Sequence, residues 1–106
     1  MGEKEHLIIG LKEFLKKVSK DFKIEKFLLF GSRARKDFSE DSDIDLIIVS
    51  KDFEEIGFFD RVKKMHSYWE IDLPVDFICY TLKEFNDLKK RITIVREALK
   101  EGIEIK

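Results

Sequence analysis

The sequence contains very few cysteine, proline and amide residues. Of its 106 residues, one is a cysteine, Cys79, and one is a proline, Pro74. A single cysteine excludes an internal disulfide framework and any metal site built from several cysteines. Glutamine is absent and asparagine occurs only at Asn86. Together with the abundant Lys and Glu, this scarcity of amides is typical of proteins from very hot environments.

Long hydrophobic runs and linkers are also absent. No stretch approaches about 18 consecutive apolar residues, and the first residues do not have the pattern of a secretory signal peptide. We therefore expect a soluble cytoplasmic protein. No repeat or Ser/Gly-rich linker divides the chain, so we expect one domain over residues 1–106. The formal net charge of -1, from 21 basic and 22 acidic residues, argues against a protein that coats nucleic acid.

Apolar residues are nonetheless plentiful, at 43% of the chain with ten phenylalanines, which is enough for one hydrophobic core. Helical spacing predicts helices over residues 3–20 and 58–70, and one broken helix or two consecutive helices between 82 and 99. Continuous apolar runs predict strands over 24–30, 43–49 and 75–80, with a short closing strand over 103–105. This alternation predicts a small α/β or α+β domain with helices packed on a sheet.

Two aspartates, Asp43 and Asp45, stand at the start of the second predicted strand. Side chains alternate along a strand, so both aspartates point to the same face. Neighbouring carboxylates repel each other, and a bound divalent cation removes that repulsion and leaves both ionised. Mg²⁺ typically binds one or two protein carboxylates, water and substrate phosphate. The spacing therefore predicts a metal–phosphate site rather than a metal cage built from protein alone.

A polar loop that begins with Gly31 and Ser32 follows the first predicted strand. Glycine permits a tight turn, and exposed N–H groups at such a turn bind phosphate together with the serine hydroxyl. Arg33 and Arg35 add guanidinium groups, which pair either with phosphate oxygens or with carboxylates of the same loop. A phosphate-binding loop beside two metal-binding carboxylates is what phosphoryl or nucleotidyl transfer requires.

A third acid is expected on an adjacent strand, because a two-metal mechanism needs a ligand near the attacking oxygen. Asp76 lies among apolar residues in the third predicted strand, which would hold its carboxylate rigidly. Asp72 precedes that strand and is the weaker candidate. The alternative for Asp76 is an ordinary surface carboxylate at the start of a strand.

Taken together, these residues form a pattern that resembles the polymerase-beta-like nucleotidyltransferase superfamily. The pattern consists of Gly31-Ser32, then Asp43-Ile44-Asp45 about ten residues later, then Asp76 on a later strand. The run GSRAR…SDIDLIIV is similar in particular to the minimal nucleotidyltransferases of bacteria and archaea. The resemblance covers nearly the whole chain and implies a small mixed sheet with helices packed on it.

The resemblance also implies a role for each residue of the pattern. Asp43, Asp45 and Asp76 would be the catalytic acids and would ligate one or two Mg²⁺ ions, with Asp76 assisting the attacking hydroxyl. The nucleotide phosphates would be held by Gly31, Ser32, Arg33 and Arg35. One departure is visible, because many relatives have glycine after the second arginine, where this chain has Lys36-Asp37. That difference affects the loop more than the carboxylates.

The family further implies an activity and a partner. Minimal nucleotidyltransferases are commonly paired with a HEPN-domain protein, as antitoxin to its ribonuclease toxin. Some members transfer AMP from ATP to a tyrosine of that toxin. We therefore expect a Mg²⁺-dependent nucleotidyltransferase that uses ATP, modifies a HEPN partner and acts as the antitoxin. Association of the chain with itself stays open.

Other readings of the same residues are weaker. An EF-hand loop starting at Asp41 would need glycine and glutamate where Leu46 and Asp52 stand. The Gly31 loop lacks the Gly-Lys-Ser/Thr of a P-loop and the glycine spacing of a dinucleotide-binding fold. An antibiotic-modifying nucleotidyltransferase would share the motif but would need a domain that binds the antibiotic.

Two questions remain open from the sequence alone. The chain could silence a HEPN partner by binding it, with a nucleotide site that no longer turns over. In addition, Phe53, Phe58 and Phe59 lie near an expected loop. They either fold inward or form an exposed apolar patch for a partner or a second copy.

Overall fold

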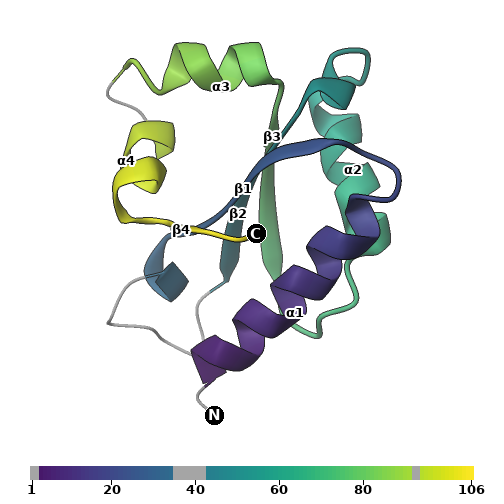
Figure 1. The fold of residues 1–106 in the computed structure, drawn as a ribbon, viewed down its shortest axis with the longest axis vertical. Helices are drawn as coiled ribbons and strands as arrows, with labels where there is room; N and C mark the ends of the chain where they lie inside the picture. Colours follow the sequence, from purple (N-terminus) through teal and green to yellow (C-terminus); the bar gives the residue numbers. More distant parts are fainter. Residues whose placement is uncertain (1–2, 35–42, 92–93) are drawn as a thin grey trace.

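The order of helices and strands follows the alternation expected from the sequence (Figure 1). The computed structural model describes residues 3–34, 43–91 and 94–106. Its elements are α1 (Glu3–Val18), β1 (Ile24–Phe30), η1 (Ser32–Ala34), β2 (Ile44–Ser50), η2 (Lys51–Phe53), α2 (Phe58–Tyr68), β3 (Val75–Tyr80), α3 (Leu82–Leu88), α4 (Ile94–Glu101) and β4 (Ile103–Glu104). The two η elements are single turns of 3₁₀-helix.

The four strands form one mixed sheet in the order β3-β2-β1-β4. Strand β1 is antiparallel to both β2 and β4, whereas β2 and β3 are parallel. The expectation of a small mixed sheet with helices packed on it is therefore confirmed. This topology places the end of β1 and the starts of β2 and β3 side by side at one end of the strands. We call this end the sheet edge.

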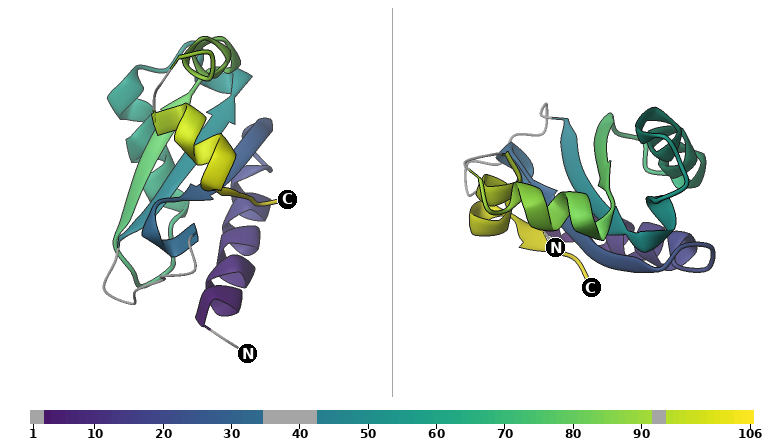
Figure 2. Two further views of the ribbon diagram at one scale, coloured as in Figure 1. Left: turned by 90° about the vertical axis from the view of Figure 1, so that its left-hand side faces the viewer. Right: turned by 90° about the horizontal axis from the view of Figure 1, so that it is seen from above.

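The helices cover the two faces of the sheet in separate layers (Figure 2). Residues of α1 and α2 pack on one face around Phe14, whose ring lies 5.6 Å from both Phe27 and Phe77. Residues of α3 and α4, including Phe85 and Val95, pack on the other face. Each strand supplies both layers, because its side chains alternate between the faces. The carboxylates at the starts of β2 and β3 lie on the α3/α4 face.

The element boundaries differ from the sequence expectation by one or two residues at the ends of several elements, and the second strand begins at Ile44 rather than at Asp43. The expected helix over 58–70 ends at Tyr68, because Trp69 takes an extended conformation and its indole N–H donates to the Leu73 carbonyl at 3.1 Å. The two helices α3 and α4 match one of the two expected arrangements, that of two consecutive helices. The first of them begins with a capping box, in which Thr81 and Glu84 accept hydrogen bonds from each other's backbone N–H groups.

The three phenylalanines near the expected loop do not behave alike. Phe53 is fully buried in the core, whereas 43% of Phe58 and 80% of Phe59 are exposed. The Phe58 and Phe59 rings lie 5.7 Å apart on the first turn of α2. Part of this group therefore folds inward and part forms a small apolar patch.

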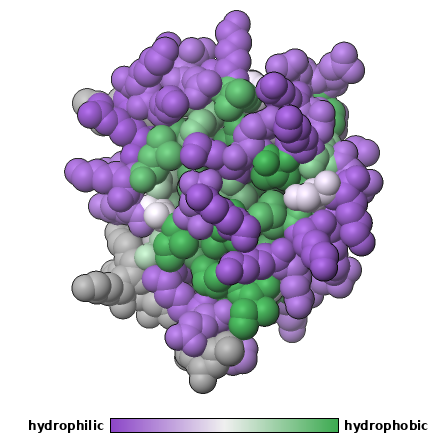
Figure 3. All heavy atoms as spheres, in the orientation of Figure 1, coloured by the Kyte–Doolittle hydropathy of each residue, from purple (hydrophilic) through white to green (hydrophobic). Residues whose placement is uncertain are grey.

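Hydrophilic residues dominate the periphery of the surface seen in Figure 3, and hydrophobic residues gather toward the middle of that face. Few large apolar side chains of the described residues are exposed, and besides the α2 patch they are Ile9, Leu73 and Leu99. No described helix has the length and apolar character needed to cross a membrane.

Arg61 on α2 is a buried cation that joins three elements. Its Nε donates to the Ile56 carbonyl at 2.8 Å, and its Nη1 donates to the Cys79 carbonyl at 3.1 Å and to Glu84 Oε1 at 2.7 Å. Partial burial would raise the pKa of Glu84, but hydrogen bonds from Thr81 and Arg61 lower it below its ordinary value. Arg61 thus fastens α2 to the end of β3 and to the start of α3.

Replacing Arg61 with methionine is expected to lower the free energy of unfolding by about 2–3 kcal/mol. The variant keeps most of the side-chain volume but leaves the Ile56 and Cys79 carbonyls without their donor. Chemical denaturation measures the effect, with Lys63→Met on the exposed face of the same helix as the matched control. The control should change stability by less than about 0.5 kcal/mol. Equal effects of the two variants would contradict the role given to Arg61.

Candidate active site

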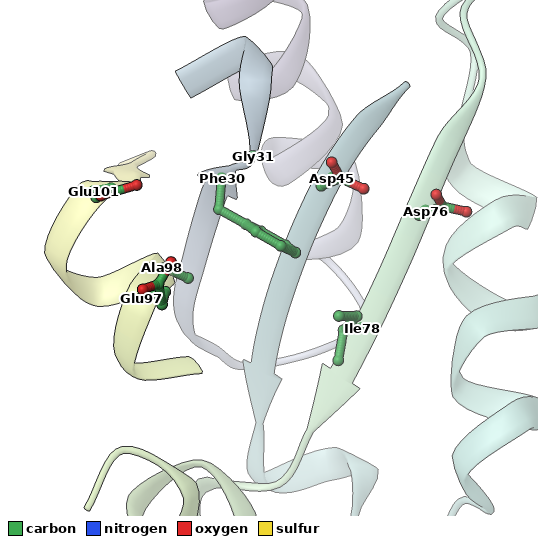
Figure 4. A pocket seen from close by; sticks show the side chains of 8 residues that line it. All are labelled: Phe30, Gly31, Asp45, Asp76, Ile78, Glu97, Ala98 and Glu101. Atoms are coloured by element: carbon green, nitrogen blue, oxygen red, sulfur yellow. The ribbon is translucent and has the colours of Figure 1, made fainter. Parts of the chain in front are cut away.

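Asp45 and Asp76 are direct neighbours across the parallel pair β2–β3. Adjacent strands lie about 4.8 Å apart, and residues paired in this way place their side chains on the same face. Both aspartates line one cavity, and Figure 4 shows them side by side on the two strands. Asp43 lies just before β2 and is exposed. Asp72, the weaker candidate, lies in the turn before β3 and does not line the cavity.

Asp45 is partly buried and lies near two other carboxylates, those of Asp76 and Asp43. Burial raises the pKa of Asp45 above its ordinary value, and the negative charges of Asp76 and Asp43 raise it further. Both effects oppose ionisation of Asp45 in the protein alone. A cation bound at these oxygens would reverse the balance and favour the charged form. Asp43 and Asp76, both selected from the sequence, are therefore close enough to Asp45 to influence its ionisation.

Gly31 ends β1 and approaches the Asp45 carboxylate closely. Its φ of 75° lies in the left-handed region, where side chains are disfavoured. A Cβ added at Gly31 would lie 2.5 Å from Oδ2 of Asp45, which is too close for van der Waals contact. Glycine is favoured here for two reasons, the backbone conformation and the space that the Asp45 carboxylate occupies.

The residues after Gly31 form a tight turn beside the carboxylates. Ser32 begins the 3₁₀ turn η1, and the Ala34 N–H donates to the Gly31 carbonyl at 3.1 Å. Arg33 is 97% buried, since only 3% of it is exposed. Its guanidinium is therefore held within the fold. Arg35 lies outside the described residues, as do Lys36 and Asp37.

Lys4 contacts this turn, although the sequence analysis did not select it. Its Nζ donates to the Ala34 carbonyl at 3.1 Å, across a sequence separation of 30 residues. The bond connects the first turn of α1 to the end of η1 and brings a positive charge to the turn. No signal in the sequence marks Lys4, because a lysine near the start of an amphipathic helix is ordinary.

Replacing Lys4 with methionine is expected to raise the KM for the nucleotide by about threefold to tenfold, with little change in kcat. The variant removes a single hydrogen bond and a partly exposed charge near the η1 turn, worth about 1 kcal/mol. Steady-state kinetics at several nucleotide concentrations measure KM and kcat separately. Lys12→Met, on an exposed position of the same helix, is the control. A change confined to kcat would contradict this assignment.

The cavity between the carboxylates and α4 has a volume of about 450 Å³. Its described lining consists of Phe30, Gly31, Asp45, Asp76, Ile78, Glu97, Ala98 and Glu101. Phe30 extends across the sheet between the aspartates and α4 (Figure 4). The sequence analysis did not select the two glutamates, because charged residues on an amphipathic helix are usually no more than a solvated face.

The donor set fits a divalent metal that is shared with a substrate. Within residues 3–34, 43–91 and 94–106, no three His, Cys, Asp or Glu side chains converge closely enough to hold an ion by themselves. Mg²⁺ usually takes one or two protein carboxylates and completes its shell with water and substrate phosphates. Asp45 and Asp76, adjacent and mutually repelling, match that arrangement.

Comparisons with known proteins agree on one chemistry. A family described as "Nucleotidyltransferase domain" matches residues 11–102, which include the described residues that line the cavity. The Methanocaldococcus jannaschii protein named "Putative protein adenylyltransferase MJ0141" is 35% identical over 75 residues, which are 66% of this chain and 75% of that protein. A second protein of that organism, "Putative protein adenylyltransferase MJ0604", is 43% identical over 50 residues, which are 44% of this chain and half of that protein.

A solved structure extends the likeness to three dimensions. The crystal structure described as a "putative nucleotidyltransferase from Sulfolobus solfataricus" superposes with a TM-score of 0.69. The match covers 95% of this chain and 80% of that chain, at 26% sequence identity. This chain and that protein therefore share an architecture. The shared part includes the sheet, the helices on its two faces and the strand ends that carry the aspartates.

Proposed function

The chain belongs to the family of nucleotidyltransferase domains, and from this premise we propose that it transfers AMP from ATP to a hydroxyl group of a protein. The proposed acceptor is a tyrosine of a partner that carries a HEPN domain, and the modification would silence that partner. The observation that carries the proposal is the pairing of Asp45 with Asp76 beside the Gly31 turn. Two archaeal relatives carry the name "Putative protein adenylyltransferase", and these names support ATP as the donor and a protein as the acceptor.

In the proposed reaction, the turn at Gly31 binds the nucleotide phosphates and Asp76 acts on the acceptor. The acceptor oxygen attacks the α-phosphorus of ATP, the bond to the bridging oxygen breaks, and pyrophosphate leaves. The backbone N–H groups around Gly31 and Ser32 orient the phosphates. Asp76 orients the acceptor hydroxyl and takes its proton, which then passes to solvent.

Asp43 and Asp45 supply negative charge that would bind the metal ion. These two carboxylates and Asp76 would hold Mg²⁺ together with water and the substrate phosphates, and the metal would neutralise charge on those phosphates. Burial, and then the charges of Asp76 and Asp43, raise the pKa of Asp45, and a cation bound between these carboxylates would offset their repulsion. The positions of Arg33 and Arg35 in the motif support phosphate binding, although the Arg33 side chain is buried.

A second function is favoured by the apolar patch on α2. Phe58 and Phe59 are exposed at the opposite end of the sheet from the aspartates, and they would suit contact with a partner protein. On this alternative the chain silences the HEPN protein by binding alone, and the nucleotide site does not turn over.

The experiment that tests the proposal uses ATP labelled at the α-phosphate. The full chain is incubated with Mg²⁺ and with individually expressed HEPN-domain proteins from the source organism, and labelled protein is detected after electrophoresis. Wild type is compared with Asp45→Asn. The proposed function predicts label on one HEPN protein with wild type only, and loss of its ribonuclease activity in step with labelling.

Each other outcome has a definite meaning. Silencing of the ribonuclease by Asp45→Asn to the same extent as by wild type would favour the binding function. Labelling with GTP, CTP or UTP in place of ATP would correct the nucleotide but keep the reaction class. An unlabelled HEPN protein, with label on another protein of a cell extract, would correct the acceptor.

A further inference from the structure

An open groove lies at the end of the strands opposite the sheet edge. Its volume is about 320 Å³, and its described lining consists of Phe58, Tyr80, Glu84, Asp87, Leu88 and Arg91. Helix α3 begins beside the start of α2, where Glu84 pairs with Arg61, and runs away from α2 toward α4 (Figure 1). The groove, which we call the α3 groove, therefore extends from the first turn of α2 to the residues that follow α3.

The Phe59 side chain projects from the surface beside the α3 groove. It is 80% exposed, and its ring lies 5.7 Å from that of Phe58 at an angle of 89°. Phe58 itself lines the groove, 6.3 Å from the Tyr80 ring. The Arg61 guanidinium lies 6.0 Å from the Phe58 ring and is fixed by three hydrogen bonds, so this end of the groove is preformed. The surface therefore carries a projecting ring and a groove side by side.

Charges of opposite sign lie at the two ends of the α3 groove. Residues 54–60, which lead into α2 and its first turn, contain no base and three exposed acids, Glu54, Glu55 and Asp60. Residues 89–91, which follow α3, are three exposed bases, Lys89, Lys90 and Arg91. None of these six side chains forms an ion pair with another residue that the structure describes. Their charges are therefore available to another molecule.

The acids inside the groove leave this polarity in place. Glu84 is paired with Arg61 at 2.7 Å, so its charge is offset. Asp87 is one helical turn before Arg91 and offsets part of the positive charge at that end. One end of the groove is therefore acidic, and the other end keeps a net positive charge.

A surface that binds a second copy across a two-fold axis must be complementary to itself. The α3 groove meets this condition in charge and in shape. Two copies placed antiparallel along their grooves bring the acidic end of each against the basic end of the other. In the same arrangement, the Phe59 ring of each copy can enter the groove of the other, beside Phe58 and Leu88. A parallel arrangement would instead place like charges together.

From this arrangement we propose that the α3 groove joins two copies of the chain in a symmetric dimer. Insertion of Phe59 supplies most of the affinity, because an aromatic side chain that fills a preformed groove is a typical hot spot of an interface. The charges at the two ends set the antiparallel orientation. The inference goes beyond the proposed function, and the dimer would cover the patch that the binding function assigns to a partner protein.

The first test measures self-association of the full chain by sedimentation equilibrium at increasing protein concentration. Wild type should be half dimeric at a concentration of about 100 µM or less. Phe59→Ser should raise the Kd of the dimer at least about 30-fold. The control is Ile9→Ser, which removes another exposed apolar side chain, on α1, and should leave the Kd within about twofold of wild type. Circular dichroism verifies that both variants are folded.

The second test reverses the charge at one end of the groove at a time. Glu54→Lys/Glu55→Lys and Lys90→Glu/Arg91→Glu should each associate with themselves at least about tenfold more weakly than wild type, because like charges then meet. An equimolar mixture of the two variants, one of them carrying a fluorophore, should form a heterodimer with a Kd within about threefold of wild type. Recovery in the mixture requires that the acidic end of one copy meets the basic end of the other.

Each contrary result overturns a defined part of the inference. Wild type that stays monomeric up to about 1 mM would refute the dimer, and Phe59-dependent binding of a HEPN protein by that monomer would assign the patch to the partner instead. A dimer that Phe59→Ser does not weaken would place the interface elsewhere. Charge variants that fail to recover in the mixture would refute the antiparallel arrangement. A dimer that passes both tests but transfers no AMP would retain the inference and reject the proposed reaction.

Discussion

Replacing Asp45 with asparagine is expected to lower nucleotidyl transfer by at least about 1000-fold and to leave the fold at least as stable as before. The carboxylate is central to the group formed with Asp76 and Asp43. A metal ligand supplies several kcal/mol of transition-state stabilisation, and each 1.36 kcal/mol is about tenfold in rate. Labelled transfer at saturating nucleotide measures the loss.

The stability of Asp45→Asn separates a chemical defect from a folding defect. Burial and the neighbouring aspartates hold the pKa of Asp45 above its ordinary value, so at neutral pH the charged carboxylate disfavours the folded state. Asparagine removes that charge, and the midpoint of thermal unfolding, measured without divalent metal, should be unchanged or higher. The control is Asp72→Asn, which neutralises an exposed aspartate outside the cavity and should transfer AMP within twofold of wild type, on the order of experimental error.

An active Asp45→Asn variant would remove the basis of the assignment. Turnover within about tenfold of wild type would mean that Asp45 is not a metal ligand. Loss of activity in Asp72→Asn, with Asp76→Asn still active, would instead show that the third acid had been assigned to the wrong residue.

Replacing Gly31 with alanine is the second change with a large expected effect. We expect kcat to fall by about 100-fold and the free energy of unfolding to fall by about 1–2 kcal/mol. The left-handed conformation at φ 75° disfavours any Cβ, which accounts for the loss of stability. The new Cβ would also press on Oδ2 of Asp45, and a displacement of about 1 Å at a catalytic group can lower a rate by about 100-fold.

Gly57→Ala is the matched control for this variant. Gly57 precedes α2 with a φ of −60°, and its added Cβ would meet nothing closer than Asp60 Oδ2 at 3.6 Å. That variant should transfer AMP normally and change stability by less than about 1 kcal/mol. Activity is compared well below the unfolding midpoint of both proteins. Equal activity of the two variants would show that the close approach of Gly31 to Asp45 is not needed for catalysis.

The sequence predicted the strand aspartates but not their pairing. Alternation places Asp43 and Asp45 on one face of a strand, and Asp76 had to lie on a neighbour for the site to form. That Asp76 faces Asp45 directly depends on β2 and β3 being parallel and in this register. The connection through α2 allows β2 and β3 to run parallel, because parallel strands need a crossover. Their pairing and register depend on the packing of the whole chain.

Residues whose role depends on tertiary packing were not predicted. Arginine is rarely buried, so nothing in the motif indicated that Arg33 would be enclosed. The glutamates of α4 became notable only when Ala98 and Val95 fixed which side of the helix meets the sheet. Gly31 was selected for phosphate binding, and the structure adds its approach to Asp45, a contact between residues 14 positions apart in the sequence.

If Asp45 and Asp76 act as proposed, the parallel pair β2–β3 makes the activity sensitive to a shift of one residue in the strand register. A slip of β3 by one position along β2 would move every β3 side chain to the opposite face, and Asp76 would exchange places with Val75 or Phe77. A chain misaligned in this way could keep its helix content and much of its apolar burial while having no third acid. Specific activity per mole of folded protein would therefore report how faithfully the strands align during refolding, which circular dichroism does not detect.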